Sequence, residues 1–338
     1  MLALNLLRIA GVFRAVTPGF PGTCTDVALD GSSEDIRIDR QRGIGYLSLL
    51  DRDTLQHGGD VNGTVLLLDL NLAEPAPRAA MSRDPAGFRP HGLSLLMRAG
   101  EPTRLFALSH PLDGGHTVEI AAQDAGGAFV PVRTVRDPAF VHPNAIAATG
   151  PEQFYLVNDR ATSEEPSLGQ RWREMLGRAG HATLVFFDGG KSTVLLDDLA
   201  FPAGLALSPD GSRLYVGESM ARALRVYRRD AASGALTLER RVKLESAPDN
   251  IDVDEDGKVW IAAHPKLLKF IAHLRDSRER APAQVLRFDP RHPDAGATQF
   301  FADDGARISA ASVAAHWRDQ ILIGALLDKK VLVCKPTP

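Results

Sequence analysis

The 338-residue chain has few cysteines, little net charge and no long apolar run. No stretch approaches the roughly 20 consecutive apolar residues that a transmembrane helix requires, so we expect no membrane span. The formal net charge is -3, which gives no electrostatic basis for binding nucleic acid. The hydrophobic fraction of 44% and the charged fraction of 24% are typical of a soluble globular protein. Small neutral or anionic molecules remain as partners.

The N-terminal segment does not have the pattern of a signal peptide, because Arg8 and Arg14 interrupt its apolar stretch. Its apolar residues recur at helical spacing, at Leu2, Leu6, Ile9, Val12, Phe13 and Val16. We therefore expect residues 1–20 to form a short N-terminal helix and lead-in packed on the body of the protein. The alternative is weak contact of this amphipathic helix with a lipid surface.

Only two cysteines are present, Cys24 and Cys334, and they lie near opposite ends of the chain. A circular fold that pairs its first and last strands would bring them together, and a disulfide there would lock the ring. The alternative is a pair of buried free thiols, because no clear export signal accompanies them. A terminal cysteine pair weakly favours an oxidising compartment.

A short apolar strand recurs six times, with central residues Tyr46, Phe106, Tyr155, Tyr215, Trp260 and Leu322. Successive central residues are 60, 49, 60, 45 and 62 positions apart, which is close to the blade length of β-propellers. Each copy also has an alternating apolar strand upstream and a second apolar strand downstream. The Asp-Gly pairs of SPDGS and DEDGK supply tight turns between strands in two copies.

These repeats predict an all-β fold, a six-bladed β-propeller that covers residues 21–338 as one domain. We expect it to be closed by pairing of the N- and C-terminal strands. A β-sandwich is the alternative. A sandwich, however, does not account for six equivalent units or for a cysteine near each end of the chain.

The first strand of each propeller blade lines the central channel, so residues at the same phase of these strands converge on one axis. The residues at this phase are Glu34, His91, Asn144, Ala203, Asp249 and, in the less clear sixth copy, Ser309. Carboxylates buried together in a narrow channel repel one another and lose solvation, and a cation removes that cost.

The oxygen atoms of these channel side chains indicate which metal ion they would bind. Carboxylate and amide oxygens favour calcium over zinc or copper, and Asn250 adds another oxygen beside Asp249. The sequence therefore predicts a calcium site with Glu34, Asn144, Asp249 and Asn250 as ligands. The alternative is a channel in which these residues are satisfied by water and by one another.

Several longer stretches resemble the paraoxonase and arylesterase family. They are SED at residues 33–35, HPNAIAATGPEQFYLVND at residues 142–159, GLALSPDGSRLYVGE, PDNIDVDEDGKVWIAAHP and ILIGALLDKKVLVC. The resemblance runs nearly end to end and extends to the two cysteines, which that family joins. It implies a six-bladed propeller related to the gluconolactonases and to strictosidine-synthase-like proteins.

The resemblance also implies a catalytic calcium with five protein ligands. Four of them match Glu34, Asn144, Asp249 and Asn250, and the fifth falls on Ala203, which offers no side-chain oxygen. Related gluconolactonases use a Glu, an Asn and an Asp, so we still expect one calcium ion to bind.

A second, structural calcium of the family uses two Asp residues that match Asp35 and Ala145. Because Ala145 supplies no carboxylate, the sequence argues against this second ion. The disulfide between the chain ends would then carry more of the stability.

His91 and His110 match the two active-site histidines of the family, and His264 matches a family histidine near the pocket. Asp159 and Ala203 are further pocket candidates. Because an imidazole accepts a proton near pH 7, a histidine pair beside a metal suits hydrolysis of lactones or aryl esters. The expected mechanism is a metal-polarised carbonyl attacked by water that His91, supported by His110, activates.

Two other functions remain open. Ala203 motivates a non-hydrolytic enzyme of the strictosidine-synthase-like type, and loss of chemistry would leave a catalytically silent binding propeller. Substrate choice is expected to depend on residues 51–63 and 161–180. In the second segment Trp172, Met175 and Leu176 have helical spacing, which indicates either a lid helix or packing on the third blade.

Overall fold

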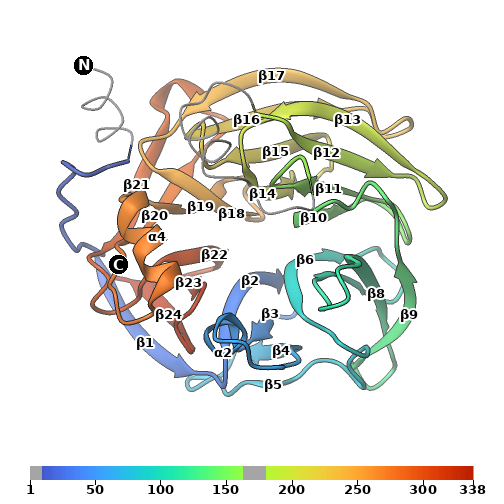
Figure 1. Cartoon of the computed structure of the whole chain (residues 1–338), viewed down its shortest axis with the longest axis horizontal. Helices are drawn as coiled ribbons and strands as arrows, with labels where there is room; N and C mark the ends of the chain where they lie inside the picture. Colours follow the sequence, from blue (N-terminus) through green and yellow to red (C-terminus); the bar gives the residue numbers. More distant parts are fainter. Residues whose placement is uncertain (1–9, 163–179, 338) are drawn as a thin grey trace.

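The computed structural model describes residues 10–162 and 180–337. These residues form six antiparallel sheets of four strands each, arranged around a central axis (Figure 1). The predicted six-bladed all-β propeller is therefore confirmed. The named helices within the described residues are α2 (Arg52–Gln56), α4 (Leu267–Arg275) and the short 3-10 helix η1 (Pro293–Ala295).

The strands of the first five blades follow one another in the chain, and the first strand of each of these blades lies nearest the axis (Figure 1). The first two blades contain β2 (Ser32–Asp39), β3 (Ile44–Leu50), β4 (Thr64–Asp69) and β5 (Arg78–Ala79), then β6 (Pro90–Leu96), β7 (Arg104–Ser109), β8 (Thr117–Gln123) and β9 (Phe129–Val135). The next two contain β10 (Pro143–Ala148), β11 (Phe154–Asn158), β12 (Ala182–Phe187) and β13 (Ser192–Leu199), then β14 (Pro202–Leu207), β15 (Arg213–Glu218), β16 (Ala223–Arg229) and β17 (Leu236–Lys243). The fifth contains β18 (Ala247–Val253), β19 (Val259–His264), β20 (Ala283–Phe288) and β21 (Ala297–Asp303).

The sixth blade joins the two ends of the chain. It contains β22 (Ala311–Trp317), β23 (Gln320–Ala325) and β24 (Lys330–Pro336), and its outer strand is β1 (Gly22–Ala28). Cys24 lies directly opposite Cys334 in the antiparallel register of β1 and β24, and the two residues form a disulfide. The cysteine pair thus links the chain ends covalently, as the sequence predicted.

The N-terminal segment differs from the expected helix. Residues 10–13 form a turn and residues 14–18 have no regular structure, while residues 1–9 lie outside the described part of the chain. Gly11 has a φ of 71°, which right-handed helical backbone does not allow, and Arg14 donates to the Glu245 carbonyl at 3.0 Å. Phe13, expected on the packed face, is 62% exposed. No helix among the described residues is long and apolar enough to cross a membrane.

Adjacent inner strands pack closely at the axis. A Cβ atom placed on Gly204 of β14 would lie 2.4 Å from the carbonyl oxygen of Asp249 on β18, so this approach requires glycine. Around the ring, apolar side chains of neighbouring blades are buried against one another, as where Leu205 and Val216 of the fourth blade meet Tyr155 and Val157 of the third. The blades therefore hold the axial residues in a fixed arrangement.

A β-bulge interrupts the pairing of the first and second strands in every blade. The unpaired positions are Glu34 with Asp35, His91 with Gly92, Asn144, Ala203, Asp249 with Asn250, and Ser312. Bulges re-aim side chains, so the polar residues of these strands turn toward the channel. The sixth position is Ser312 and not Ser309, because β22 begins only at Ala311.

Candidate functional site in the central channel

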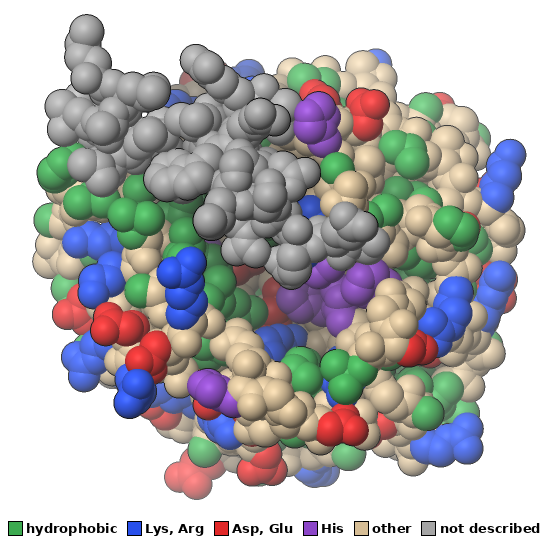
Figure 2. Space-filling model, in the orientation of Figure 1, with side chains coloured by type: hydrophobic (Ala, Val, Ile, Leu, Met, Phe, Trp, Pro, Cys, Tyr) green, Lys and Arg blue, Asp and Glu red, His purple; other side chains and the backbone are tan. Residues whose placement is uncertain are grey.

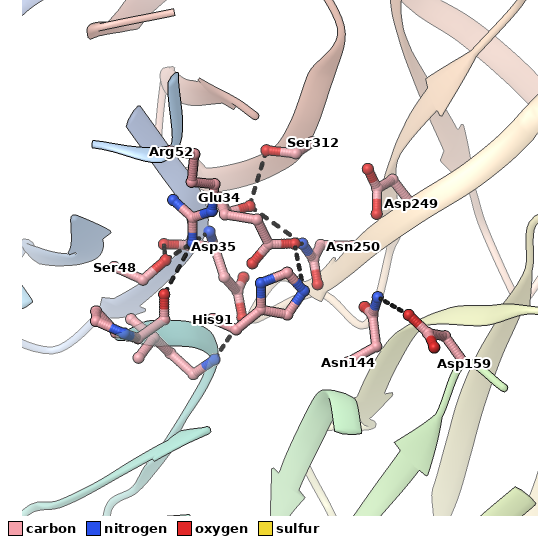
Figure 3. Close-up of polar contacts among 12 residues, drawn as sticks. Glu34, Asp35, Ser48, Arg52, His91, Asn144, Asp159, Asp249, Asn250 and Ser312 are labelled. Carbon is pink, nitrogen blue, oxygen red and sulfur yellow. Dashed lines mark hydrogen bonds and ion pairs between the residues drawn. The ribbon is translucent and has the colours of Figure 1, made fainter. Parts of the chain in front are cut away.

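The bulges bring residues from four blades together around Glu34 (Figure 3). Its Oε1 accepts a hydrogen bond from Asn250 Nδ2 at 2.6 Å and lies 3.6 Å from His91 Nε2. Its backbone carbonyl accepts a hydrogen bond from Ser312 Oγ at 2.8 Å. The structure therefore brings Glu34, Asn250 and His91, which were predicted separately as ligands and as a catalytic base, into contact.

Three buried oxygens of this ring have no hydrogen-bond donor among the described residues: Glu34 Oε2, Asn144 Oδ1 and Asn250 Oδ1. Both asparagines donate their amide nitrogens to carboxylates, since Asn144 Nδ2 lies 3.3 Å from Asp159 Oδ2. That orientation leaves the amide oxygens as acceptors. Buried acceptors without partners are costly, and a bound cation with a preference for oxygen ligands would reduce that cost.

Asp249 lies beside the same ring but also has a side-chain partner. Its Oδ2 is 2.8 Å from His264 Nε2, and the His264 ring stacks on Phe270 of α4 with centroids 3.7 Å apart. This contact fixes the orientation of the Asp249 carboxylate. Of the expected pocket residues, His264 thus contacts Asp249, Asp159 contacts Asn144, and Ala203 leaves the fourth blade without a polar side chain at its bulge.

Burial raises the pKa of Glu34 well above its usual value, and the neighbouring carboxylates of Asp35 and Asp249 raise it further. The opposing charge comes from Arg52 of α2, which donates to the carbonyl oxygens of Ser32 and Pro90. Burial lowers the pKa of Arg52 to about 10. Arg52 was not predicted as a site residue, because nothing in its local sequence indicates that α2 turns it toward the axis.

Asp35, the candidate for a second ion, is satisfied by the chain itself. Its carboxylate accepts hydrogen bonds from the backbone nitrogens of Ile36 at 2.8 Å and Leu93 at 2.7 Å, and from Arg37 at 3.0 Å. Ala145 is fully buried and supplies no side-chain oxygen. These residues do not fit a second calcium ion.

A group of histidines lies next to the oxygen ligands. The His91 and His110 rings are in edge contact with centroids 5.1 Å apart, so the two predicted histidines lie together. His116 and His142 extend the group, with centroids 4.6 and 5.2 Å from that of His110. Figure 2 shows histidine side chains gathered beside the hollow at the centre of this face.

Burial lowers the pKa of His91 to about 3 and that of His110 well below its usual value, and neighbouring cationic groups add to both shifts. The two rings are therefore neutral at pH 7, and each keeps a nitrogen that can accept a proton.

His116 and His142 were not predicted as site residues, although their positions at strand ends indicate their location. His110 directly follows β7, His116 directly precedes β8, and His142 directly precedes β10. In antiparallel blades these positions lie at the same edge as the start of the inner strands, where the axial residues also lie. The expected lid residues Trp172, Met175 and Leu176 lie outside the described residues.

Comparisons with known proteins identify the family of the chain. A family model described as arylesterase matches residues 29–335. The chain is 30% identical to serum paraoxonase/arylesterase 1 of Rattus norvegicus, over 94% of this chain and 90% of that protein. It is 25% identical to serum paraoxonase/lactonase 3 of Rattus norvegicus, over 98% of this chain and 94% of that protein.

Solved structures support the fold. A putative gluconolactonase superimposes with a TM-score of 0.57 at 14% identity, covering 96% of this chain and 94% of that chain. This likeness extends to the propeller architecture alone.

Proposed function

Because the chain belongs to the arylesterase family, we propose that it is a calcium-dependent hydrolase of lactones or aryl esters. The relatives named arylesterase and lactonase support this substrate class. The ion would be held by Glu34, Asn144, Asp249 and Asn250. We further propose that one ion binds, because the residues around Asp35 are already satisfied.

One observation carries the proposal: three buried side-chain oxygens without hydrogen-bond donors adjoin a pair of neutral histidines. A calcium ion held by these oxygens would supply a Lewis acid for the substrate carbonyl and for the negative charge that develops on it. Asp249, oriented by His264, and Asn250, oriented by Glu34, position the ligand oxygens.

In the proposed mechanism His91 accepts a proton from the attacking water as the new carbon–oxygen bond forms. His110, in edge contact with His91, positions the ring. The proton that His91 accepts then passes to the leaving oxygen as the ester or lactone bond breaks, so the ring is neutral again at the end of the cycle.

The test is hydrolysis of a panel of lactones and aryl esters by wild type and by Glu34→Gln and His91→Gln. Glu279→Gln is the matched control, because Glu279 is about half exposed and makes a 3.5 Å ion pair with Lys269. We expect loss of activity by about 100-fold or more in the two site variants and none in the control. Full activity after exhaustive chelation, or wild-type activity in both site variants, would refute the mechanism.

The alternative functions give different results in the same experiment. Calcium binding without turnover of any lactone or ester would support the hypothesis of a non-hydrolytic enzyme, which Ala203 motivates. Absence of both calcium binding and turnover supports a silent binding propeller.

A further inference from the structure

His110, His116 and His142 form a compact nitrogen cluster at one edge of the second and third blades. One ring nitrogen from each lies within 4.8 Å of the others. The ring centroids of His116 and His142 are 5.3 Å apart, and each ring also contacts His110. All three side chains are partly buried, so none of them is sealed in the core.

Two of these histidines have buried nitrogens without hydrogen-bond partners among the described residues, His110 Nε2 and His116 Nδ1. In the third, His142, Nδ1 lies 2.8 Å from Asp159 Oδ1. A carboxylate oxygen accepts in this contact, so His142 Nδ1 donates and Nε2 presents a lone pair.

We infer that His110, His116 and His142 form a second metal site, which takes a transition-metal ion of the zinc class. Imidazole nitrogens suit Zn²⁺ and poorly suit calcium, so this site differs in chemistry from the oxygen ring at Glu34. Three histidines with one open position are a known zinc ligand set. A carboxylate that orients a metal-binding histidine, as Asp159 orients His142, is the usual outer-shell arrangement.

Metal binding requires two local adjustments. With Zn–N distances of about 2.1 Å, tetrahedral geometry places ligand nitrogens about 3.4 Å apart, so the rings must close from their present spacing. Arg160 Nη2 lies 3.0 Å from His142 Nε2, and the ion replaces this hydrogen bond. Arg160 thus competes with the metal for His142 Nε2. Replacing Arg160 by alanine should therefore increase the affinity of the site for zinc.

Zinc at this site would engage His110 and withdraw it from His91, so zinc would inhibit the hydrolase while calcium stays bound. That consequence rests on the proposed function, whereas zinc binding itself does not. A direct binding measurement therefore separates failure of the zinc site from failure of the hydrolase proposal.

The experiment titrates Zn²⁺ into the tag-free full chain in calcium-saturated buffer, by calorimetry against a competing chelator. We expect one zinc ion per chain. His116→Gln and His142→Gln should weaken binding by about 100-fold, and Arg160→Ala should strengthen it. His292→Gln is the control, because His292 is exposed and outside the cluster. Co²⁺ should give the visible absorption of a four-coordinate ion with histidine ligands.

Several outcomes would overturn the assignment. One is wild-type protein that takes up no zinc, and another is a His116→Gln variant that binds zinc as wild type does. Displacement of zinc by excess calcium would place the ion at the oxygen ring and also refute the three-histidine site. Because Arg160→Ala predicts a gain of affinity, misfolding of a histidine variant cannot imitate the full pattern.

Discussion

The Arg37 guanidinium lies 3.0 Å from the Asp35 carboxylate, measured from Nη2 to Oδ2, and connects three blades near the axis. Its Nε donates to the Leu93 carbonyl at 2.9 Å and its Nη1 to the Ile251 carbonyl at 2.7 Å. The resemblance to paraoxonases implies a structural calcium at Asp35, and here an arginine supplies positive charge beside that carboxylate. We propose that Arg37 takes over the structural role of the second ion.

Replacing Arg37 should therefore destabilise the protein strongly. Arg37→Gln leaves the Asp35 carboxylate buried without its charged partner, and we expect a loss of about 3 to 5 kcal/mol in the free energy of unfolding. Urea unfolding measures this loss, with the exposed Arg83→Gln as control. Wild-type stability in Arg37→Gln, or two calcium ions bound to the wild-type chain, would contradict the proposed role.

Alkaline pH should destabilise the fold through its buried tyrosines. Burial raises the pKa of Tyr215 from 10.0 to about 12, so the folded state holds a proton that the unfolded state releases earlier. The resulting stabilisation is fully present below pH 10 and disappears as the pH rises to about 12. Unfolding curves between these pH values should show a smaller decline in Tyr215→Phe. An identical decline in both proteins would be inconsistent with this assignment.

The disulfide between Cys24 and Cys334 closes a loop of 310 residues in sequence. Cross-linking so long a loop restricts the unfolded chain, so reduction should lower the free energy of unfolding by about 5 to 6 kcal/mol in the chain-entropy model. Differential scanning calorimetry with and without reductant measures the resulting fall in melting temperature. The Cys24→Ser, Cys334→Ser double variant serves as control, since reductant should not change its melting temperature. Equal melting of oxidised and reduced wild type would argue against this contribution.

The sequence predicted the features of the fold that depend on local patterns. Strand alternation and turns located all six blades, and the phase of the inner strands identified Glu34, Asn144 and Asp249 as equivalent positions, which the structure places at bulges. Only the phase of the sixth inner strand was predicted wrongly, because β22 and the residues before it are rich in alanine, which gives weak alternation. The assignment fell on Ser309, three residues before Ser312.

Strand alternation and turn patterns do not predict which side chains of different blades contact one another. Arg37 reaches backbone carbonyls of two other blades, and His116 meets His142 across a blade boundary. Neither contact follows from spacing along the chain, because each depends on how the blades are arranged around the axis. Within the expected N-terminal helix, residues 10–18 are not helical for a local reason, the left-handed backbone at Gly11.

Ala203 is the position at which a gain of calcium affinity can be designed. It occupies the bulge of β14, equivalent to Asn144 of β10, and its buried methyl group offers no oxygen. Ala203→Asn adds an amide oxygen there, and Ala203→Leu adds a side chain of similar size without one. If the oxygen ring binds calcium, we expect calorimetry to show tighter binding by about tenfold in Ala203→Asn and weaker binding in Ala203→Leu. Equal affinities in both variants would mean that the fourth blade does not face the ion, and the proposed coordination would then have to exclude β14.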